Sequence, residues 1–321
     1  MATYLIRRVL WACVLFIAVT MVTFIIFFVI PQDPARQACG QRATAECIAR
    51  ARHFLGLDRP LVVQYGSFLN RLVVHQSLGH SFTTRQDVTH QVLIAAPVTA
   101  SLVFGGMIIW LLVSIPMGIL SALRPRSLLD RIGMVGVLVG ISAHPVWIGL
   151  LASYFFGFRL GMFPITGYCD LISPTGDCGG PVQWAYHLIL PWLCFSVLYA
   201  ATYVRMIRAY TMETLGEDYV RTARAKGAPE PTVLRSHVLR NALLPVVTIL
   251  GMDIGLALGG AFFTESVFGL PGLGKLSVGA IGNFDLPTVQ GVVVFATLCI
   301  IVFNLVVDTL YAWVDPRIRL T

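Results

Sequence analysis

Six long apolar runs constrain what this chain can fold into more than any other feature of its sequence. They cover residues 9–30, a part of 91–123, 132–158, 186–204, 242–264 and 286–307. A helix needs about 20 apolar residues to cross the roughly 30 Å hydrocarbon layer of a bilayer, and its backbone must be hydrogen-bonded internally. Since 56% of the residues are hydrophobic and only 12% are charged, the sequence predicts an all-α integral membrane protein with six transmembrane helices.

The first run follows Arg7 and Arg8, as the core of a secretory signal peptide would. Its 22 uncharged residues are more than a usual signal core contains, and no small-x-small cleavage site follows them. We therefore expect this run to remain in the protein as a membrane span.

The lysine and arginine residues predict the orientation of the chain. Fourteen of the 23 lie at the two termini and in residues 124–131 and 205–240, which six spans place on one side of the membrane. Seven of the other nine lie in residues 31–90, and long segments of this kind cross largely regardless of charge. Both termini are therefore expected in the cytoplasm. The net charge of +7 then reflects orientation in the membrane, and we expect no nucleic-acid partner.

Four of the seven cysteines lie outside the apolar runs, in two close pairs. Cys39 lies near Cys47, and Cys169 lies near Cys178. An oxidising exterior allows each pair to form a disulfide, but the spacing alone leaves four free thiols as the alternative. The Pro-Thr-Gly turn in CDLISPTGDC brings the ends of the second loop together, so it favours that disulfide over the first.

The fifth apolar run has two faces of different chemistry. Gly251, Gly255 and Gly259 form a stripe of small residues against which another helix can pack closely. The opposite face carries Asp253, Ala257, Gly260 and Thr264. An acid inside a membrane span is costly, so it normally faces a cavity or a polar partner. Two interpretations stay open: this face lines a water-accessible translocation path, or Asp253 accepts a hydrogen bond from a neighbouring helix.

One stretch of the sequence comes close to a nucleotide-binding motif. GLPGLGKL, residues 269–276, follows the phosphate-binding pattern G-x-x-x-x-G-K-[ST] except that Leu276 replaces the hydroxyl residue. No strand precedes it, and the orientation places it outside the cell, away from ATP. No metal-binding or catalytic pattern occurs elsewhere, so we expect no catalytic residue, no metal site and no enzyme activity.

A basic segment, YVRTARAKGAPEPTVLRSHVLRNALLP, separates the fourth and fifth runs. Gly227, Pro229 and Pro231 predict the end of one short helix and the start of another, which together form a helix-turn-helix at the cytoplasmic surface. Val220, Ala223 and Gly227 share a small, uncharged face that suits insertion into a groove on another protein. The alternative is a basic segment that binds anionic lipid headgroups, which the residues alone favour slightly.

The motif order resembles one family of membrane proteins. YVRTARAKG followed by HVLRNALLP is similar to the cytoplasmic coupling loop, the EAA region, of permease subunits in ABC importers of the dipeptide/oligopeptide class. LGLDRPLVVQY, SLGHSF, FPITGY, ESVFGLPGLGKL and DPRIRL resemble the B-type permease of that class in the same order. Three features depart from the wider EAA pattern: Arg221 stands for its Glu, Thr222 for its first Ala, and Leu244-Pro245 comes late. The first two changes resemble the peptide class.

This resemblance implies an ABC type I importer permease fold in the plasma (inner) membrane of a prokaryote. Residues 1–30 would form the N-terminus and first span, 31–93 an extracytoplasmic segment, and 94–321 the permease core with a coupling loop at 211–242. The implied partners are a second six-span permease, two ATPase subunits that bind ATP and Mg²⁺, an extracytoplasmic substrate-binding protein and membrane lipid. This chain itself would bind no cofactor. The residues expected to contact the ATPase are Arg221, Arg224, Ala225, Lys226, Gly227, Ala228, Pro229 and Glu230.

The substrate class is the least constrained expectation. The resemblance favours di- or oligopeptides, but permeases of this class also carry nickel chelates, glutathione and other small solutes. An ion-coupled secondary transporter with Asp253 as its proton site is a second possibility, although such folds usually contain inverted repeats that this sequence lacks. A membrane enzyme is a third, and it would need a metal or nucleophile constellation.

Overall fold

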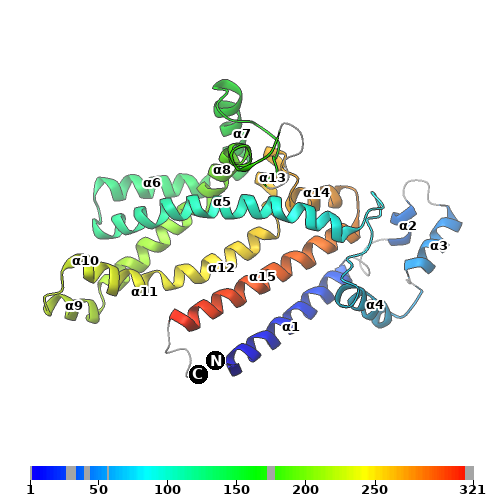
Figure 1. Ribbon diagram of the computed structural model, residues 1–321, viewed down its shortest axis with the longest axis horizontal. Coiled ribbons are helices and arrows are strands. Elements are labelled where there is room, and N and C mark those ends of the chain that lie inside the picture. The colour runs from blue at the N-terminus through cyan, green and yellow to red at the C-terminus, as the bar shows by residue number, and fades with distance from the viewer. Residues whose placement is uncertain (1, 27–33, 40–43, 56–57, 172–177, 315–321) are drawn as a thin grey trace.

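A computed structural model describes residues 2–26, 34–39, 44–55, 58–171 and 178–314, and these residues are almost entirely helical (Figure 1). No strand occurs in these ranges; an isolated bridge between His80 and Asp87 closes a turn before α5. The helices, in chain order, are α1 (Ala2–Phe24), α2 (Pro34–Cys39), α3 (Ala45–Leu55), α4 (Leu61–Val73), α5 (Val88–Leu123), α6 (Leu128–Ser142), α7 (Pro145–Ala152), the π-helical η3 (Ser153–Arg159), α8 (Pro181–Leu215), α9 (Asp218–Ala225), α10 (Glu230–Thr232), the π-helical η4 (Val233–Leu239), α11 (Arg240–Ala242), α12 (Leu244–Leu258), α13 (Phe262–Phe268), α14 (Leu273–Gly282) and α15 (Leu286–Val314).

Four helical segments of the described chain are long and apolar enough to cross a membrane. They are Ile6–Phe24 of α1, Val88–Leu123, Pro181–Leu215 and Leu286–Val307 of α15. Two bent pairs raise the number to as many as six: Asp130–Ser142 with Pro145–Arg159, bent by 103°, and Glu230–Ala242 with Leu244–Leu258, bent by 43°. The sharper bend falls at His144-Pro145, because a proline cannot continue the helix before it.

The spanning helices α5, α12, α15 and α1 lie side by side in this order, while α8 packs against α5 (Figure 1). The α9–α10 region lies at one end of this layer, and α2, α3 and α4 lie at the opposite end. α5 begins at Val88, so the boundary that we expected between residues 93 and 94 falls inside this helix. The apolar runs therefore form this layer of helices, and the polar connections between them lie at its ends.

The core forms where α5 and α8 meet. Trp110 of α5 and Tyr203 of α8 are fully buried, and their rings pack 5.9 Å apart. Gly106 lets the helices approach, because a Cβ there would lie 2.7 Å from the Phe195 ring. Large aromatic side chains on α8 thus occupy space that glycine leaves on α5.

The glycine stripe of the fifth apolar run packs as we predicted. A Cβ on Gly255 would lie 2.9 Å from the Ile300 Cα, and one on Gly259 would lie 2.9 Å from the Ala296 Cβ. Gly251 meets Val307 in the same way. This stripe therefore brings the backbones of α12 and α15 into close contact.

The length of this span differs from the prediction. We expected it to reach Thr264, but α12 ends at Leu258 and α13 starts at Phe262. Gly260 between them has φ of 137°, a conformation that L side chains rarely adopt and that a helix cannot contain. The apolar composition continues past this point, so hydropathy alone did not show the break.

Candidate functional site

The basic segment after α8 folds into a compact unit, which we call the α9–α11 hairpin (residues 218–242). Val220 of α9 faces Val233 and Val238 of η4, and all three are fully buried. Ala223 and Ala228 pack against this small core. The Asn241 amide donates a hydrogen bond to the Tyr219 hydroxyl at 3.0 Å, which joins the two arms at their base. The hairpin therefore has its own hydrophobic centre.

The turn at the tip depends on Gly227. Its φ of 80° is left-handed, and space around it is open, since a Cβ would meet nothing within 4 Å. The Gly227 N–H donates to the Arg224 carbonyl at 2.9 Å, and the Ala228 N–H donates to the Ala223 carbonyl at 3.2 Å. These two bonds form a Schellman motif, in which a left-handed glycine ends a helix.

An ion pair closes the same turn from outside. Arg224 Nε donates to Glu230 Oε1 at 2.7 Å, and a terminal guanidinium nitrogen lies 3.3 Å from Oε2. Both side chains are largely exposed, so the pair contributes only about 0.2–1 kcal/mol to stability. Its effect is geometric: it holds the charged tip in one arrangement.

The structure brings the predicted ATPase-contact residues together at this tip. Most of them are exposed, and Ala228 is half-buried: Arg221, Arg224, Ala225, Lys226, Gly227, Ala228, Pro229 and Glu230. One interpretation of the sequence was wrong. The small face of Val220 and Ala223 does not remain free for another protein, because it packs against η4 inside the hairpin. The turn and its charged rim are exposed.

Asp253 hydrogen-bonds a neighbouring helix, which is one of the two interpretations that the sequence left open. The Tyr203 hydroxyl of α8 donates to Asp253 Oδ2 at 2.7 Å. Ala257 is buried on the same helix, whereas Gly260 and Thr264 lie beyond the end of α12. Helical periodicity predicted that these four residues share one face of a helix. The structure shows that they do not. Their role in a translocation path stays a prediction.

Sequence reasoning missed an ion pair at the loop between α5 and α6. Arg208 of α8 donates to both oxygens of Asp130, at 2.8 and 3.0 Å. Ser121 of α5 and the Arg126 N–H donate to the same carboxylate. Asp130 is buried, so the pair connects three helices near the end of α8 that leads into the hairpin. The alternation of apolar and charged residues gave no signal for it, because the partners are 78 residues apart.

The glycine-rich loop that resembled a phosphate-binding motif holds a carboxylate of this chain. Glu265 of α13 is fully buried; it accepts hydrogen bonds from the Thr99 hydroxyl at 2.7 Å and the Lys275 N–H at 3.0 Å. The Lys275 N–H belongs to the first turn of α14, so Glu265 caps this helix. A Cβ on Gly272 would collide with the carboxylate. Gly272 is thus explained by the room that Glu265 needs.

We predict that the stability contributed by Glu265 depends on pH. Burial raises the pKa of Glu265 above its ordinary value of 4.5, against the opposing effect of the Thr99 and backbone hydrogen bonds. The native state therefore holds this proton at pH values where the unfolded chain releases it, so stability is lost as pH rises through the native pKa. The Tm of the wild type should fall relative to that of Glu265→Gln between pH 4.5 and this raised pKa. A Tm difference that stays constant over pH would contradict this.

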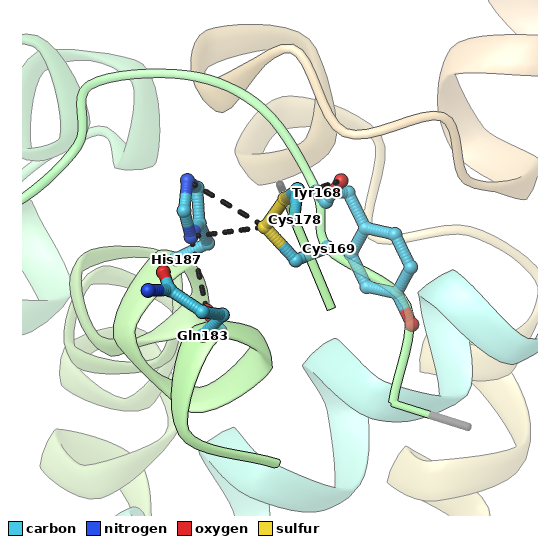
Figure 2. Close-up of a disulfide and its surroundings, with 5 residues drawn as sticks. All are labelled: Tyr168, Cys169, Cys178, Gln183 and His187. Atoms are coloured by element: carbon cyan, nitrogen blue, oxygen red, sulfur yellow. Dashed lines mark hydrogen bonds between the residues drawn. A yellow bond between two sulfur atoms is a disulfide. The ribbon is translucent and has the colours of Figure 1, made fainter. Parts of the chain in front are cut away.

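The structure joins both predicted cysteine pairs as disulfides, Cys39–Cys47 and Cys169–Cys178. The second lies beside His187 near the start of α8, as Figure 2 shows.

Comparison with known proteins matches the full length of the chain. Residues 114–320 match the model of the binding-protein-dependent transport system inner membrane component, and residues 1–103 match that of its N-terminal region. The probable D,D-dipeptide transport system permease protein of Escherichia coli (strain K12) is 39% identical over 98% of this chain and 97% of its own length. The di/tripeptide transport system permease protein of Pseudomonas aeruginosa (strain UCBPP-PA14) is 39% identical over 99% of both chains, and a putative peptide transport system permease protein of Brucella abortus (strain 2308) is 38% identical over 99% of both. With this match and its layer of apolar helices, the chain belongs to the family of binding-protein-dependent transport system inner membrane components.

Proposed function

We propose that this chain is one of two membrane-spanning subunits of an ATP-driven importer of di- or oligopeptides. The observation that carries the proposal is the end-to-end similarity, near 39% identity, to permeases whose names specify peptide transport. The exposed tip of the α9–α11 hairpin supports it, because an importer needs a rigid contact between its membrane helices and its ATPases. A single chain of this kind forms half of the translocation path, and a second six-span permease forms the other half.

The partners divide the work. Two ATPase subunits bind ATP and Mg²⁺ in the cytoplasm, where they contact the hairpin tips of the two permeases. An extracytoplasmic binding protein delivers the peptide to the opposite side. In this arrangement both termini of the chain lie in the cytoplasm and the protein resides in the plasma membrane of a prokaryote. The charge distribution supports this orientation, since it follows the positive-inside rule.

The packing explains how movement of the tip reaches the membrane. The hairpin has its own core, so it moves as one body. Its second arm leads directly into α12, and α12 packs backbone-to-backbone on α15 through the glycine stripe. Closure of the ATPases therefore tilts α12 and α15 together between inward-open and outward-open states. ATP drives this change only because it binds the two states with different affinity.

The charged rim gives a test that separates docking from folding. Reversing one charge in Arg224→Glu or Glu230→Arg should lower peptide uptake and ATPase stimulation several-fold, while Tm changes by little, since an exposed pair contributes only about 0.2–1 kcal/mol. Uptake of a radiolabelled dipeptide into proteoliposomes that contain all partner subunits measures the first effect. Thermal unfolding of the purified chain measures the second.

The double variant Arg224→Glu/Glu230→Arg restores the ion pair within the turn but not the charge pattern offered to a partner. Recovery of uptake in the double variant would show that the ion pair acts by holding the geometry of the turn. Continued loss of uptake would show that the two side chains contact the ATPase. Full uptake in both single variants would contradict the proposed docking site. Uptake of nickel chelates or glutathione in place of peptides would overturn the substrate assignment alone.

A further inference from the structure

Three side chains with metal-binding chemistry meet where the outer loop enters α8. They are Cys169 and Cys178, at the two ends of the loop, and His187, in the second turn of α8 (Figure 2). One ligand atom from each lies within 4.8 Å of the other two. Cys169 is almost completely buried, whereas Cys178 and His187 are partly exposed, so the cluster is accessible from one side.

The imidazole of His187 is held in an orientation that suits a ligand. Its Nδ1 lies 2.9 Å from the Gln183 carbonyl oxygen. A carbonyl only accepts hydrogen bonds, so Nδ1 carries the proton and Nε2 carries the free lone pair. Nε2 lies 3.8 Å from the Cys169 sulfur, and Nδ1 lies 3.3 Å from it, so both ring nitrogens are close to this sulfur. Metal-binding histidines commonly donate their other ring N–H to a backbone carbonyl in this way.

The other disulfide of the described chain, Cys39–Cys47, provides an internal comparison. Cys39 and Cys47 are also close enough to bond. Within the described ranges, no third histidine, cysteine or acidic side chain joins that pair at metal-ligand distance. A structural disulfide therefore does not require a histidine beside it, and the position of His187 calls for a separate explanation.

We propose that Cys169, Cys178 and His187 form a Zn²⁺ site when the cysteine pair is reduced, so that the loop is closed either by a disulfide or by a metal. A dithiol reductant supplies two electrons and two protons, becomes a disulfide itself, and converts the Cys169–Cys178 bond into two thiols. Binding of Zn²⁺ then displaces both thiol protons and yields two thiolate ligands. With Nε2 of His187 these make three protein ligands, and water takes the fourth tetrahedral position.

The site would keep the loop in place in both redox states. The Gly167 N–H donates to the Phe268 carbonyl of α13 at 3.3 Å, and the Tyr168 hydroxyl lies 3.4 Å from the Ser101 hydroxyl of α5. Residues 167 and 168, next to the cluster, therefore rest on α13 and on the candidate membrane span α5. If the cysteines separated without a metal, these contacts would lose their covalent support.

The experiment uses the purified full-length chain in the Cys39→Ser/Cys47→Ser background, which removes the other outer thiols. After reduction with a phosphine, ZnCl₂ is titrated in competition with a chelating dye, and Co²⁺ serves as a spectroscopic probe of thiolate ligation. We expect about one Zn²⁺ per reduced chain and none at the same affinity in the oxidised chain. His187→Phe keeps a ring but removes both nitrogens, and it should weaken binding by at least the roughly 10- to 100-fold that loss of an outer-shell partner costs.

Further substitution of Cys169 and Cys178 by serine should abolish Zn²⁺ binding and the Co²⁺–thiolate absorption. If that variant does not yield folded protein, the comparison of oxidised with reduced chain and the His187→Phe variant decide the question. Equal Zn²⁺ binding by oxidised and reduced protein would overturn the proposal, as would unchanged affinity in His187→Phe.

Discussion

Replacing Gly255 with leucine is expected to abolish folding of this chain or to lower its Tm by several degrees. A Cβ at this position would lie 2.9 Å from the Ile300 Cα, which is backbone and cannot rotate away. Overpacking of a close contact costs about 1–3 kcal/mol, and more where the obstacle is main chain. Thermal unfolding followed by size-exclusion chromatography in detergent measures the loss, together with the yield of monodisperse protein.

Gly136 provides the matched control. It lies in the middle of α6, it is exposed, and a Cβ there would meet nothing within 4 Å. Gly136→Leu should therefore retain the Tm and the yield of the wild type. Equal stability of the two leucine variants would show that the close approach of α12 and α15 is not required for the fold.

Replacing Gly227 with valine is expected to reduce transport at least about tenfold while the protein still inserts into the membrane. Gly227 has φ of 80°, and a β-branched residue in a left-handed conformation costs roughly 1–2 kcal/mol, which opens the turn or shifts it to another geometry. The turn is exposed and lies outside the apolar runs, so the membrane helices should not be affected. Uptake by the full complex and co-purification of the ATPase subunits measure the effect.

Gly227→Asn separates turn geometry from contact at the tip. Asparagine tolerates the left-handed conformation, so it keeps the turn but adds a side chain to it. Retained uptake in this variant with loss in Gly227→Val would assign the effect to the backbone conformation. Loss in both would place Gly227 itself against the partner. Normal uptake in both variants would remove the hairpin tip from the mechanism.

Much of the fold could be predicted because its causes are local. The length and hydrophobicity of each run identified the candidate spans. The spacing of Gly251, Gly255 and Gly259 predicted the contact with a neighbouring helix, although it did not show that the neighbour is α15. The turn at Gly227 followed from glycine and proline chemistry within a few residues.

The candidate site was predicted in part. The sequence identified the tip of the α9–α11 hairpin, but it assigned the small face of Val220 to a partner, because periodicity does not say what covers an apolar face. That face packs on Val233 and Val238, which the chain brings back after the turn. The break after Leu258 was also missed, since an apolar run gives no sign that its backbone leaves the helix at Gly260.

The sequence by itself determined the membrane spans, the stripe of glycines and the location of the exposed turn, because these depend on residues close together in the chain. Only the tertiary structure decided which polar groups meet. Thr99 and Glu265 are 166 residues apart, and Tyr203 and Asp253 are 50 apart. Buried polar groups need hydrogen-bond partners, but this need alone does not show which groups will pair. The packing of α5, α8, α12 and α13 determines which polar groups pair, and it also places His187 beside Cys169.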